Sequence, residues 1–244
     1  MTTGAATAPQ VAVLAGGLGS RIEGVAGGRP KALVPILGEP FAHHQMRLLA
    51  SQGIREIVYV IGFRGDQIRR EVGDGSEFGL AVSYVDEGDQ LHGTGGALRF
   101  AHDAGSLDDT FGVVYGDSYL PVDLRPVWVA FDSSGCPALM TVLQNDDLWD
   151  RSNAVFEKGR VTSYDKRPQN RDPRMRWIDF GFSVLRRDVI EAIPRGTVCD
   201  LADVFHDLTL RGDLAGFEVN TRFFEVGSPD GAAALETYLE SLER

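Results

Sequence analysis

The stretch VAVLAGGLGSRI, residues 11–22, joins an unbroken apolar run to three glycines and an arginine. A strand that is buried on both faces of a parallel sheet has such a run, and glycine ends it. Glycines at this point let backbone N–H groups turn toward a bound anion with no side chain in the way. Their order matches neither the dinucleotide fingerprint nor the phosphate-binding P-loop. Two interpretations therefore stay open, a tight turn that serves only the fold and a cradle for phosphate.

Strand and helix patterns alternate along the first half of the chain. This order predicts right-handed crossovers and a mostly parallel sheet. The predicted strands cover 11–17, 56–62, 80–87 and 111–117, and the predicted helices cover 40–52, 65–73 and 93–105.

The second half has a different order of elements. A hairpin is predicted at 153–167, because two short alternating runs flank the turn residues Lys158 and Gly159. In a helix predicted within 199–212, Asp200 is the expected N-cap and Gly212 the expected end. The other expectations are a helix in 121–131, a strand at 137–144, a strand and helix in 177–194, and a last strand and helix in 222–242, where Ser228 caps and Pro229 takes the first position.

No linker separates the two halves, so the pattern predicts a single α/β domain. We expect a Rossmann-like, mostly parallel mixed sheet that is flanked by helices and carries a small β-hairpin insertion. Residues 1–9 are expected to form a flexible tail, and residues 10–244 the domain.

Composition argues against several classes of protein. The chain of 244 residues has 24 Lys and Arg against 35 Asp and Glu, a formal net charge of −11. Such acidity argues against a nucleic-acid partner, and no apolar run approaches the ~20 residues of a membrane span. The first ten residues lack both parts of a signal peptide, so we expect a cytoplasmic protein with no membrane partner. Cys136 and Cys199 indicate neither a disulfide framework nor a zinc site.

Four stretches of the sequence each follow a predicted strand. They are the opening AGGLGSR, GTGG at 93–96, GD at 116–117 and EVG at 225–227. Open α/β sheets bind ligands outside the carboxyl ends of their strands. The alternating order places these ends at one edge of the sheet, so we expect the four stretches to meet there.

Charged residues in and near these stretches suit a polyphosphate. Arg21 supplies a guanidinium fork and Lys31 an ammonium point charge, one within and one beyond the glycines. Asp117 follows the apolar run FGVVY, where a carboxylate belongs at the strand end. Opposite a phosphate loop, Asp117 would hold Mg²⁺, with Glu225 as a second ligand. The purely structural alternatives are a turn residue for Asp117 and an edge-strand charge for Glu225.

Other polar residues leave the choice between ligand and surface open. Thr94 is placed to cap its own helix, and the glycines around it let a flat base lie close. Lys166 follows a hairpin strand, and Asp179 alternates with apolar residues, so each is either a ligand residue or a structural charge. NDD at 145–147 has the acidity of a glycosyltransferase metal motif, but a solvated turn is the simpler interpretation.

Taken in order, seven motifs of this chain resemble those of the sugar-1-phosphate nucleotidylyltransferases. The resemblance extends over nearly the whole chain. Within this family, the chain looks most like the small heptose-1-phosphate guanylyltransferases, which share the GTGGA turn. The motifs are LAGGLGSR, RPKALVPILGEPF, GTGGAL, VVYGDSY, YDKRP, IDFGFSVL and FFEVGSPDG.

The resemblance implies a nucleotide site in the N-terminal half of the domain and a sugar-phosphate site in the C-terminal half. It implies that Arg21, Lys31 and Asp117 are catalytic and that Asp117 and Glu225 hold Mg²⁺. Glu225 stands where the family usually has Asp, and DFG at 179–181 replaces the NAG of many members. The implied nucleotide-binding residues are Leu14, Ala15, Gly16, Gly17, Gly19, Ser20, Gly93, Thr94, Gly95 and Gly96, and the implied sugar-phosphate residues are Lys166, Asp179 and Gly181.

The implied reaction is attack by a phosphate oxygen of a sugar 1-phosphate on the α-phosphorus of an NTP, with release of pyrophosphate. Overall likeness favours GTP and a heptose 1-phosphate. Three alternatives stay open: cytidylyl or other nucleotidylyl transfer to a different phosphorylated acceptor, a GT-A-type glycosyltransferase, and a non-enzymatic nucleotide sensor. GDS at 116–118 lacks the second aspartate of the glycosyltransferase D-x-D motif. The apolar helix with His43 and His44 is a candidate homodimer face.

Overall fold

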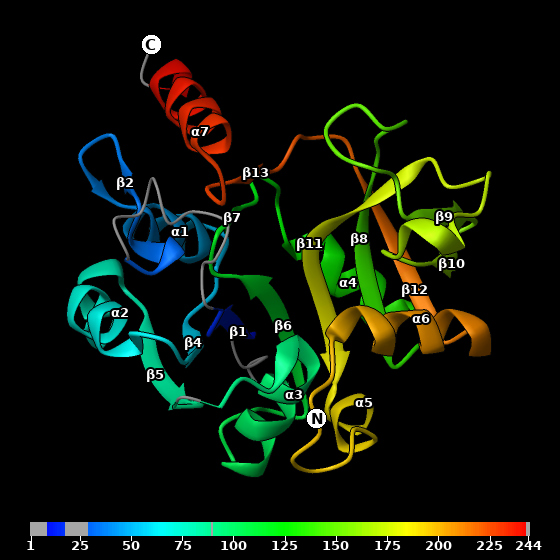
Figure 1. The fold of residues 1–244 in the computed structure, drawn as a ribbon, viewed down its shortest axis with the longest axis horizontal. Coiled ribbons are helices and arrows are strands. Elements are labelled where there is room, and N and C mark those ends of the chain that lie inside the picture. Colours follow the sequence, from blue (N-terminus) through cyan, green and yellow to red (C-terminus); the bar gives the residue numbers. More distant parts are fainter. Residues whose placement is uncertain (1–8, 18–28, 89, 243–244) are drawn as a thin grey trace, which may run out of the picture.

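The computed structural model describes residues 9–17, 29–88 and 90–242, so residues 1–8 of the expected tail lie outside the described residues. The strands of the central sheet are β1 (Gln10–Ala15), β4 (Glu56–Ile61), β5 (Ala81–Asp86), β6 (Thr110–Tyr115), β8 (Ala138–Gln144), β9 (Ala154–Glu157), β10 (Arg160–Tyr164), β11 (Trp177–Arg186) and β12 (Leu214–Val219). They lie in the order β5-β4-β1-β6-β11-β8-β12-β10-β9 (Figure 1).

Helices cover both faces of this sheet. They are α1 (Phe41–Ser51), α2 (Gly65–Val72), α3 (Gly93–Asp103), α4 (Arg125–Ser134), α5 (Arg187–Glu191) and α6 (Leu201–Arg211). Helix α7 (Pro229–Leu242) packs instead in a separate apolar cluster with Ile36 and Phe41. Helices α1, α2 and α4 share one apolar layer with Val11 and Val13 of β1, while α3, α5 and α6 share the other with Ala12 and Leu14. Successive side chains of a strand point to opposite faces, which is why the run at 11–14 is apolar without interruption.

The strand directions make this a mixed sheet. Strands β5, β4, β1 and β6 are parallel to one another, and so are β8 and β12. Strand β11 runs antiparallel to both β6 and β8 and joins the two parallel parts. The predicted single α/β domain with a mixed sheet is confirmed.

Local signals for turns and caps behave as expected. Lys158 and Gly159, between β9 and β10, have φ values of 50° and 76°, the left-handed pair that a two-residue hairpin turn needs. The Asp200 side chain accepts a hydrogen bond from the N–H of Ala202 at 2.9 Å and caps α6. Ser228 accepts one from the N–H of Gly231 at 3.1 Å at the start of α7.

The sequence analysis missed β12. A Cβ on Gly216 would lie 2.7 Å from the ring of Phe156 on β9, so this mid-strand glycine is required by close packing, and it weakens the strand pattern. The last predicted strand is only β13 (Phe224–Glu225), which pairs with β7 (Ser118–Tyr119) outside the central sheet. A further small hairpin joins β2 (Pro35–Ile36) and β3 (Glu39–Pro40).

Candidate active site

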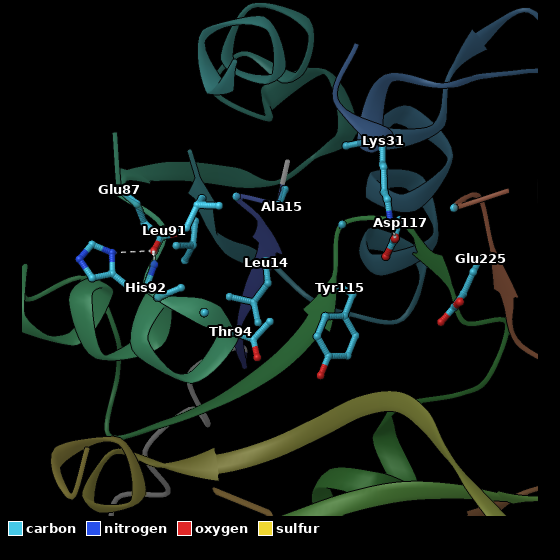
Figure 2. A pocket seen from close by; sticks show the side chains of 18 of the residues that line it. Leu14, Ala15, Lys31, Glu87, Leu91, His92, Thr94, Tyr115, Asp117 and Glu225 are labelled. Atoms are coloured by element: carbon cyan, nitrogen blue, oxygen red, sulfur yellow. Dashed lines mark hydrogen bonds and ion pairs between the residues drawn. The ribbon is translucent and has the colours of Figure 1, made fainter. Parts of the chain in front are cut away.

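A cleft of about 710 Å³ lies at the carboxyl ends of β1, β4, β5 and β6. Figure 2 shows Leu14, Glu87, Tyr115 and Asp117 approaching it from these strand ends, with Glu225 at one side. The first residues of α3 close the other side. The described parts of the four stretches that were expected to meet at one sheet edge therefore do so. Parallel strands present the same end to that edge, whereas EVG at 225–227 reaches it from outside the central sheet.

The cleft brings together most of the predicted site residues, but not all of them. Gly19, Ser20 and Arg21 lie outside the described residues. Gly95, Gly96, Asp179 and Gly181 are absent from the cleft wall. The predicted residues that line it are Leu14, Ala15, Gly16, Gly17, Lys31, Gly93, Thr94, Asp117, Lys166 and Glu225.

Lys31 and Asp117 form an ion pair in this cleft. The Nζ atom of Lys31 lies 2.8 Å from Oδ2 of Asp117. A Cβ on Gly227 would lie 3.4 Å from that ammonium and 3.5 Å from that carboxylate, so the glycine turn before α7 leaves the pair accessible. An ammonium and a carboxylate at one strand end are groups that bind phosphate and a divalent cation respectively.

Three hydrogen bonds fix the turn after β6 that contains Asp117. Gln45, a buried side chain of α1, donates hydrogen bonds to the carbonyls of Tyr115 at 2.8 Å and Ser118 at 2.7 Å. The carbonyl of Asp117 accepts a hydrogen bond from the N–H of Val226 at 2.9 Å. Gln45 was not predicted as a site residue, because a polar residue inside an amphipathic helix carries no signal of its long-range partner.

Glu225 reaches the cleft through the pairing of two short strands. In the β13–β7 pair it stands opposite Ser118, the residue after Asp117. Desolvation by the surrounding protein and then the charge of Asp117 raise the pKa of Glu225, while Lys166 and Lys31 oppose this shift. A carboxylate whose proton affinity is raised by a neighbouring carboxylate indicates a place for a cation.

The opposite end of the cleft carries an acidic residue that the sequence analysis missed. Glu87, which directly follows β5, is buried, and its Oε1 lies 2.9 Å from Nδ1 of His92 (Figure 2). Its Oε2 lies so close to Gly16 that a Cβ there would be only 2.5 Å away. Burial raises the pKa of Glu87 and the hydrogen bonds with His92 lower it. Its place at the end of a predicted strand was the available signal.

Gly95 and Gly96 pack against protein instead of facing the cleft. Their N–H groups donate to the carbonyl of Cys199 at 2.9 and 3.1 Å. A Cβ on Gly96 would lie 2.7 Å from the carbonyl oxygen of Thr197. These two glycines are needed because the segment before α6 crosses the first turn of α3, so the expected contact with a base or ribose is not supported for them.

Thr94 lines the cleft, but its hydroxyl does not cap α3. It donates to Oδ1 of Asp200 at 2.9 Å and accepts from the N–H of Leu201 at 2.8 Å. The hydroxyl therefore ties the start of α3 to the start of α6, and the expected cap of its own helix is wrong. The sequence could not show this, because the partners of the Thr94 hydroxyl are more than 100 positions away in the chain and come close only on folding.

Lys166 faces the cleft with Asp179 behind it. Its Nζ lies 3.4 Å from Oδ2 of Asp179, and it lies over the rings of Tyr115 and Tyr164 at 5.6 and 5.9 Å from their centres. Burial alone lowers the pKa of Lys166, but the negative charges around it, Asp179 first, outweigh burial and raise the pKa above its usual value. The Asp179 side chain is only 4% exposed, so it contacts Lys166 from within the protein.

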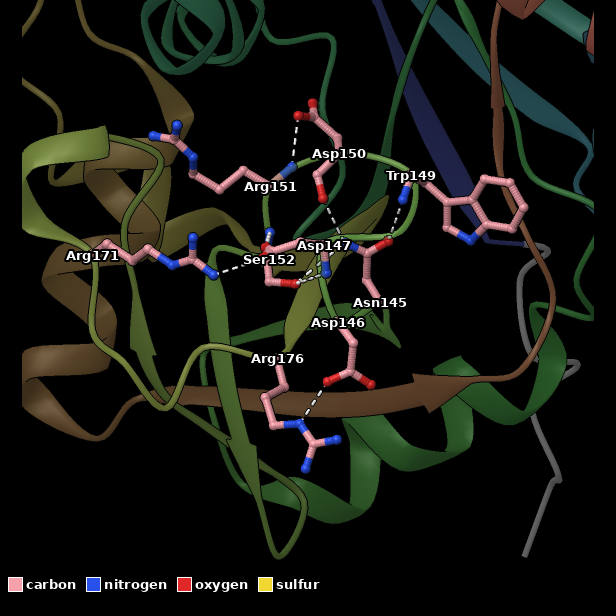
Figure 3. Close-up of polar contacts among 9 residues, drawn as sticks. All are labelled: Asn145, Asp146, Asp147, Trp149, Asp150, Arg151, Ser152, Arg171 and Arg176. Carbon is pink, nitrogen blue, oxygen red and sulfur yellow. Dashed lines mark hydrogen bonds and ion pairs between the residues drawn. The ribbon is translucent and has the colours of Figure 1, made fainter.

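The acidic NDD stretch forms a closed surface turn (Figure 3). Asp146 and Asp147 have φ values of 47° and 62°, and their carboxylates pair with Arg176 and Arg171. Asn145 anchors the turn by donating to the carbonyl of Asp150 at 2.6 Å. Because both aspartates already have cationic partners, the turn interpretation is supported and the metal-motif interpretation is not.

Two wider features of the described residues bear on the site. None of the helices between residues 9 and 242 that the structure describes is long and apolar enough to cross a membrane. Within the same described part, no group of three or more His, Cys, Asp or Glu side chains is arranged to hold a metal ion. Any metal held by Asp117 and Glu225 would need further ligands from a substrate or solvent.

Comparison with known proteins shows the family to which this chain belongs. Residues 11–177 match the model of the MobA-like NTP transferase domain. The mannose-1-phosphate guanylyltransferase of Mycobacterium tuberculosis is 30% identical over 223 residues, which are 89% of this chain and 61% of that enzyme. The D-glycero-alpha-D-manno-heptose 1-phosphate guanylyltransferase of Aneurinibacillus thermoaerophilus is 23% identical, with 89% of this chain and 93% of that enzyme covered.

A solved structure agrees over a similar span. HddC from Yersinia pseudotuberculosis, complexed with GMP-PN, has a TM-score of 0.77 and 25% identity, with 95% of this chain and 99% of that chain covered. Other relatives are named for uridylyl, thymidylyl and cytidylyl transfer. This chain spans less than two thirds of several curated relatives, 61% and 58% in two cases. The chain belongs to the MobA-like NTP transferase family, and its named relatives are sugar-1-phosphate nucleotidylyltransferases.

Proposed function

We propose that this protein transfers a nucleotidyl group from an NTP to a sugar 1-phosphate, giving an NDP-sugar and pyrophosphate, with GTP and a heptose 1-phosphate as the preferred pair. The observation that carries the proposal is one cleft with a lysine from each half of the chain. Lys31 stands beside the glycine loop, and Lys166 stands beside β10. We assign the nucleotide to the N-terminal half of the domain and the sugar phosphate to the C-terminal half.

Catalysis in this proposal is the positioning of two anions that repel each other. A phosphate oxygen of the sugar 1-phosphate attacks the α-phosphorus, and the bond to the leaving pyrophosphate breaks. No covalent intermediate on the protein is required, because the nucleophile is already an anion. Lys31 offsets charge on the triphosphate, and Lys166 holds the acceptor phosphate. The segment from Leu14 to Gly17 ends in two glycines, so its backbone can lie close to the NTP. Arg21 is proposed to assist at the triphosphate.

The charges of the cleft support a divalent cation. Lys31 and Lys166 each have an aspartate within 3.4 Å, and Glu87 and Glu225 add two more carboxylates. A triphosphate entering these described residues would therefore meet an excess of negative charge. Asp117 and Glu225 offer the hard oxygen ligands that Mg²⁺ prefers, and we propose that they hold it. Bound there, Mg²⁺ would neutralise phosphate charge as a Lewis acid.

The preference for GTP has support from the buried acid at the far end of the cleft. A carboxylate accepts hydrogen bonds, and guanine offers adjacent N1–H and N2–H donors, whereas uracil and thymine offer a single N–H between two carbonyls. Glu87 has its Oε2 directed at Gly16 on the cleft wall. We therefore propose Glu87 as the residue that favours guanine.

The decisive test is a panel of five NTPs and pooled sugar 1-phosphates with Mg²⁺, read out as pyrophosphate release. GTP is expected to support turnover, and Glu87→Gln is expected to reduce its advantage over UTP by about tenfold or more. Glu77→Gln, an exposed glutamate, is the control. Release with CTP alone would favour the cytidylyl alternative. Binding of NTP without release from any pair would mean a nucleotide sensor and would refute the proposed transfer.

We propose a cytoplasmic enzyme with NTP and sugar 1-phosphate as its partners, and α1 as the contact between two copies. His43 and His44 lie half-buried on α1, and His44 Nε2 is 2.9 Å from the carbonyl oxygen of Ile36. Sedimentation equilibrium of the protein and of a His43→Glu variant tests the assembly.

A further inference from the structure

We propose that Asp179 is a positioning residue that holds the Lys166 ammonium toward the acceptor phosphate, and that it is not itself a ligand of the sugar. This inference rests on the proposed function, because the phosphate that Lys166 meets is the acceptor of that reaction. It revises the role of sugar-phosphate ligand that the resemblance implies for Asp179.

All the contacts of the Asp179 carboxylate are made within the protein. Oδ2 lies 3.4 Å from Nζ of Lys166 and accepts a hydrogen bond from the hydroxyl of Tyr164 at 3.1 Å. Oδ1 accepts one from the N–H of Gly181 at 3.0 Å. The carboxylate is therefore occupied on both oxygens, and its side chain is only 4% exposed. A group in this state has little remaining capacity to bind a sugar hydroxyl.

The backbone of β11 is shaped to aim this carboxylate. Pairing with β8 shifts register between Asp179 and Ser183, which is the signature of a bulge. Gly181, within the bulge, has φ +101°, a backbone conformation that residues other than glycine rarely adopt. The N–H of Asp179 donates to Oδ1 of Asn153 at 2.9 Å, which fixes the start of the bulge. Bulges re-aim side chains next to active sites, so the DFG sequence builds the mount for Asp179.

Lys166 has protein contacts on several sides and is open to the cleft. Tyr115 and Tyr164 place their rings 5.6 and 5.9 Å from its ammonium, and Asp179 lies behind it. The Lys166 side chain remains 44% exposed, and the residue lines the cleft. An incoming phosphate thus meets an ammonium that is already oriented, and the four rotatable bonds of the lysine need little further ordering.

The first experiment compares kinetic constants of the wild type with Asp179→Asn. We expect kcat/KM for the sugar 1-phosphate to fall about tenfold, because an untethered lysine must be ordered by the substrate. KM for the NTP should stay within about twofold, since Asp179 is absent from the cleft wall. Equal changes for both substrates, or no change for the acceptor, would overturn the proposal.

Thr141→Val is the matched control. Its hydroxyl is fully buried and donates to the carbonyl of Phe182 at 2.6 Å, within the same bulge, but it does not contact Lys166. The control should lower the melting temperature and leave the acceptor constants unchanged. An equal loss of acceptor kcat/KM in Thr141→Val would show that Asp179 has only a structural role.

The second experiment does not depend on activity. Lysine acylation by acetic anhydride, followed by mass spectrometry across a pH series, reports the fraction of Lys166 that is unprotonated. Asp179, Tyr115 and Tyr164 contact Lys166, and the charges of Asp200 and Glu225 also act on it. Removing the Asp179 charge leaves burial as the opposing influence, so the labelling midpoint should move to lower pH in Asp179→Asn.

An unmoved midpoint in folded Asp179→Asn would overturn the proposal. If that variant fails to fold, Asp179→Ser, which keeps an acceptor near the N–H of Gly181, takes its place with the same expectation. If the wild type shows no transfer with any substrate pair, the proposed function fails, whereas the labelling midpoint still decides whether Asp179 controls Lys166.

Discussion

The Nζ atom of Lys31 and Oδ2 of Asp117 lie 2.8 Å apart in the cleft, although 86 residues separate the two in the chain. Their side chains are 28% and 22% exposed, so the pair is open to a ligand on one side. The pair is made possible by the turn after β6, which Gln45 and Val226 hold in place. A triphosphate that binds the Lys31 ammonium must compete with the Asp117 carboxylate for it. A cation bound to Asp117 would release Lys31, so cation binding should favour binding of the NTP.

Replacing Asp117 by Asn should reduce pyrophosphate release by about 100-fold or more, because a neutral amide offsets neither Lys31 nor a bound cation. The fold should remain, since partly exposed ion pairs contribute at most about 1 kcal/mol to the free energy of unfolding. Steady-state assays together with thermal melting measure both effects. Asp123→Asn, which removes the exposed partner of Arg125, is the control and should keep full activity. Normal turnover in Asp117→Asn would remove this residue from the catalytic set.

Gly216→Ala should lower the free energy of unfolding by about 1–3 kcal/mol, because the new methyl group overpacks against a ring. Its Cβ would lie 2.7 Å from the ring of Phe156 and 3.1 Å from Val161. Urea unfolding followed by circular dichroism measures the difference. Gly17→Ala, whose Cβ has no neighbour within 4 Å, should unfold like the wild type. Equal stability of the two variants would contradict the close packing of β9 on β12.

Gly231→Ala should impair turnover by about tenfold or more through displacement of Glu225. A Cβ on Gly231 would overlap the carbonyl oxygen of Glu225, so the start of α7 and β13 must separate. Small misplacements at a reacting centre have large effects on rate. The kinetic assay at saturating substrates measures the loss. Ala233→Gly, on the exposed side of the same helix, weakens α7 without touching Glu225, and it should retain most of the activity.

Asp165 should make stability depend on pH in the acid range. Hydrogen bonds from Arg167 hold the pKa of this buried carboxyl well below its ordinary value of 3.8, against the effect of burial. A depressed pKa in the folded state gives stability that is present above about pH 4 and is lost as pH falls toward the folded value. Asp165→Asn should therefore lower the free energy of unfolding by about 1–3 kcal/mol at pH 7 and by less at pH 3.

Urea unfolding at the two pH values checks this expectation for Asp165. Asp172 forms the same kind of local contact with Arg174, but its side chain is 22% exposed against 5% for Asp165, so Asp172→Asn should have a clearly smaller effect than Asp165→Asn at pH 7. A pH-independent loss in Asp165→Asn would mean that the carboxyl stabilises the fold by shape alone.

The candidate site was predictable where its residues follow a strand. Leu14 to Gly17 and Asp117 stand at the ends of β1 and β6, which are parallel and so bring these ends together, whereas Glu225 joins them from the β13–β7 pair. Glu87 has the same position and was missed, because its partner His92 becomes informative only once β5 is known to end beside Gly16. Gly95 and Gly96 were predicted as site residues, but they contact the segment at Cys199 instead. Their glycine pattern does not distinguish close packing against a ligand from close packing against another part of the chain.

By itself, the sequence determined most of the order of strands and helices, the hairpin at Lys158 and Gly159, the caps of α6 and α7 and the edge of the sheet that carries the site. These features depend on periodicity and on residues a few positions apart. Tertiary structure alone decided that β12 joins the sheet, with Gly216 packed under the ring of Phe156. It alone also decided that Lys31 pairs with Asp117 and that Asp179 lies behind Lys166 instead of in the cleft. The physical reason is that each depends on which distant side chain fills the remaining space or compensates the remaining charge.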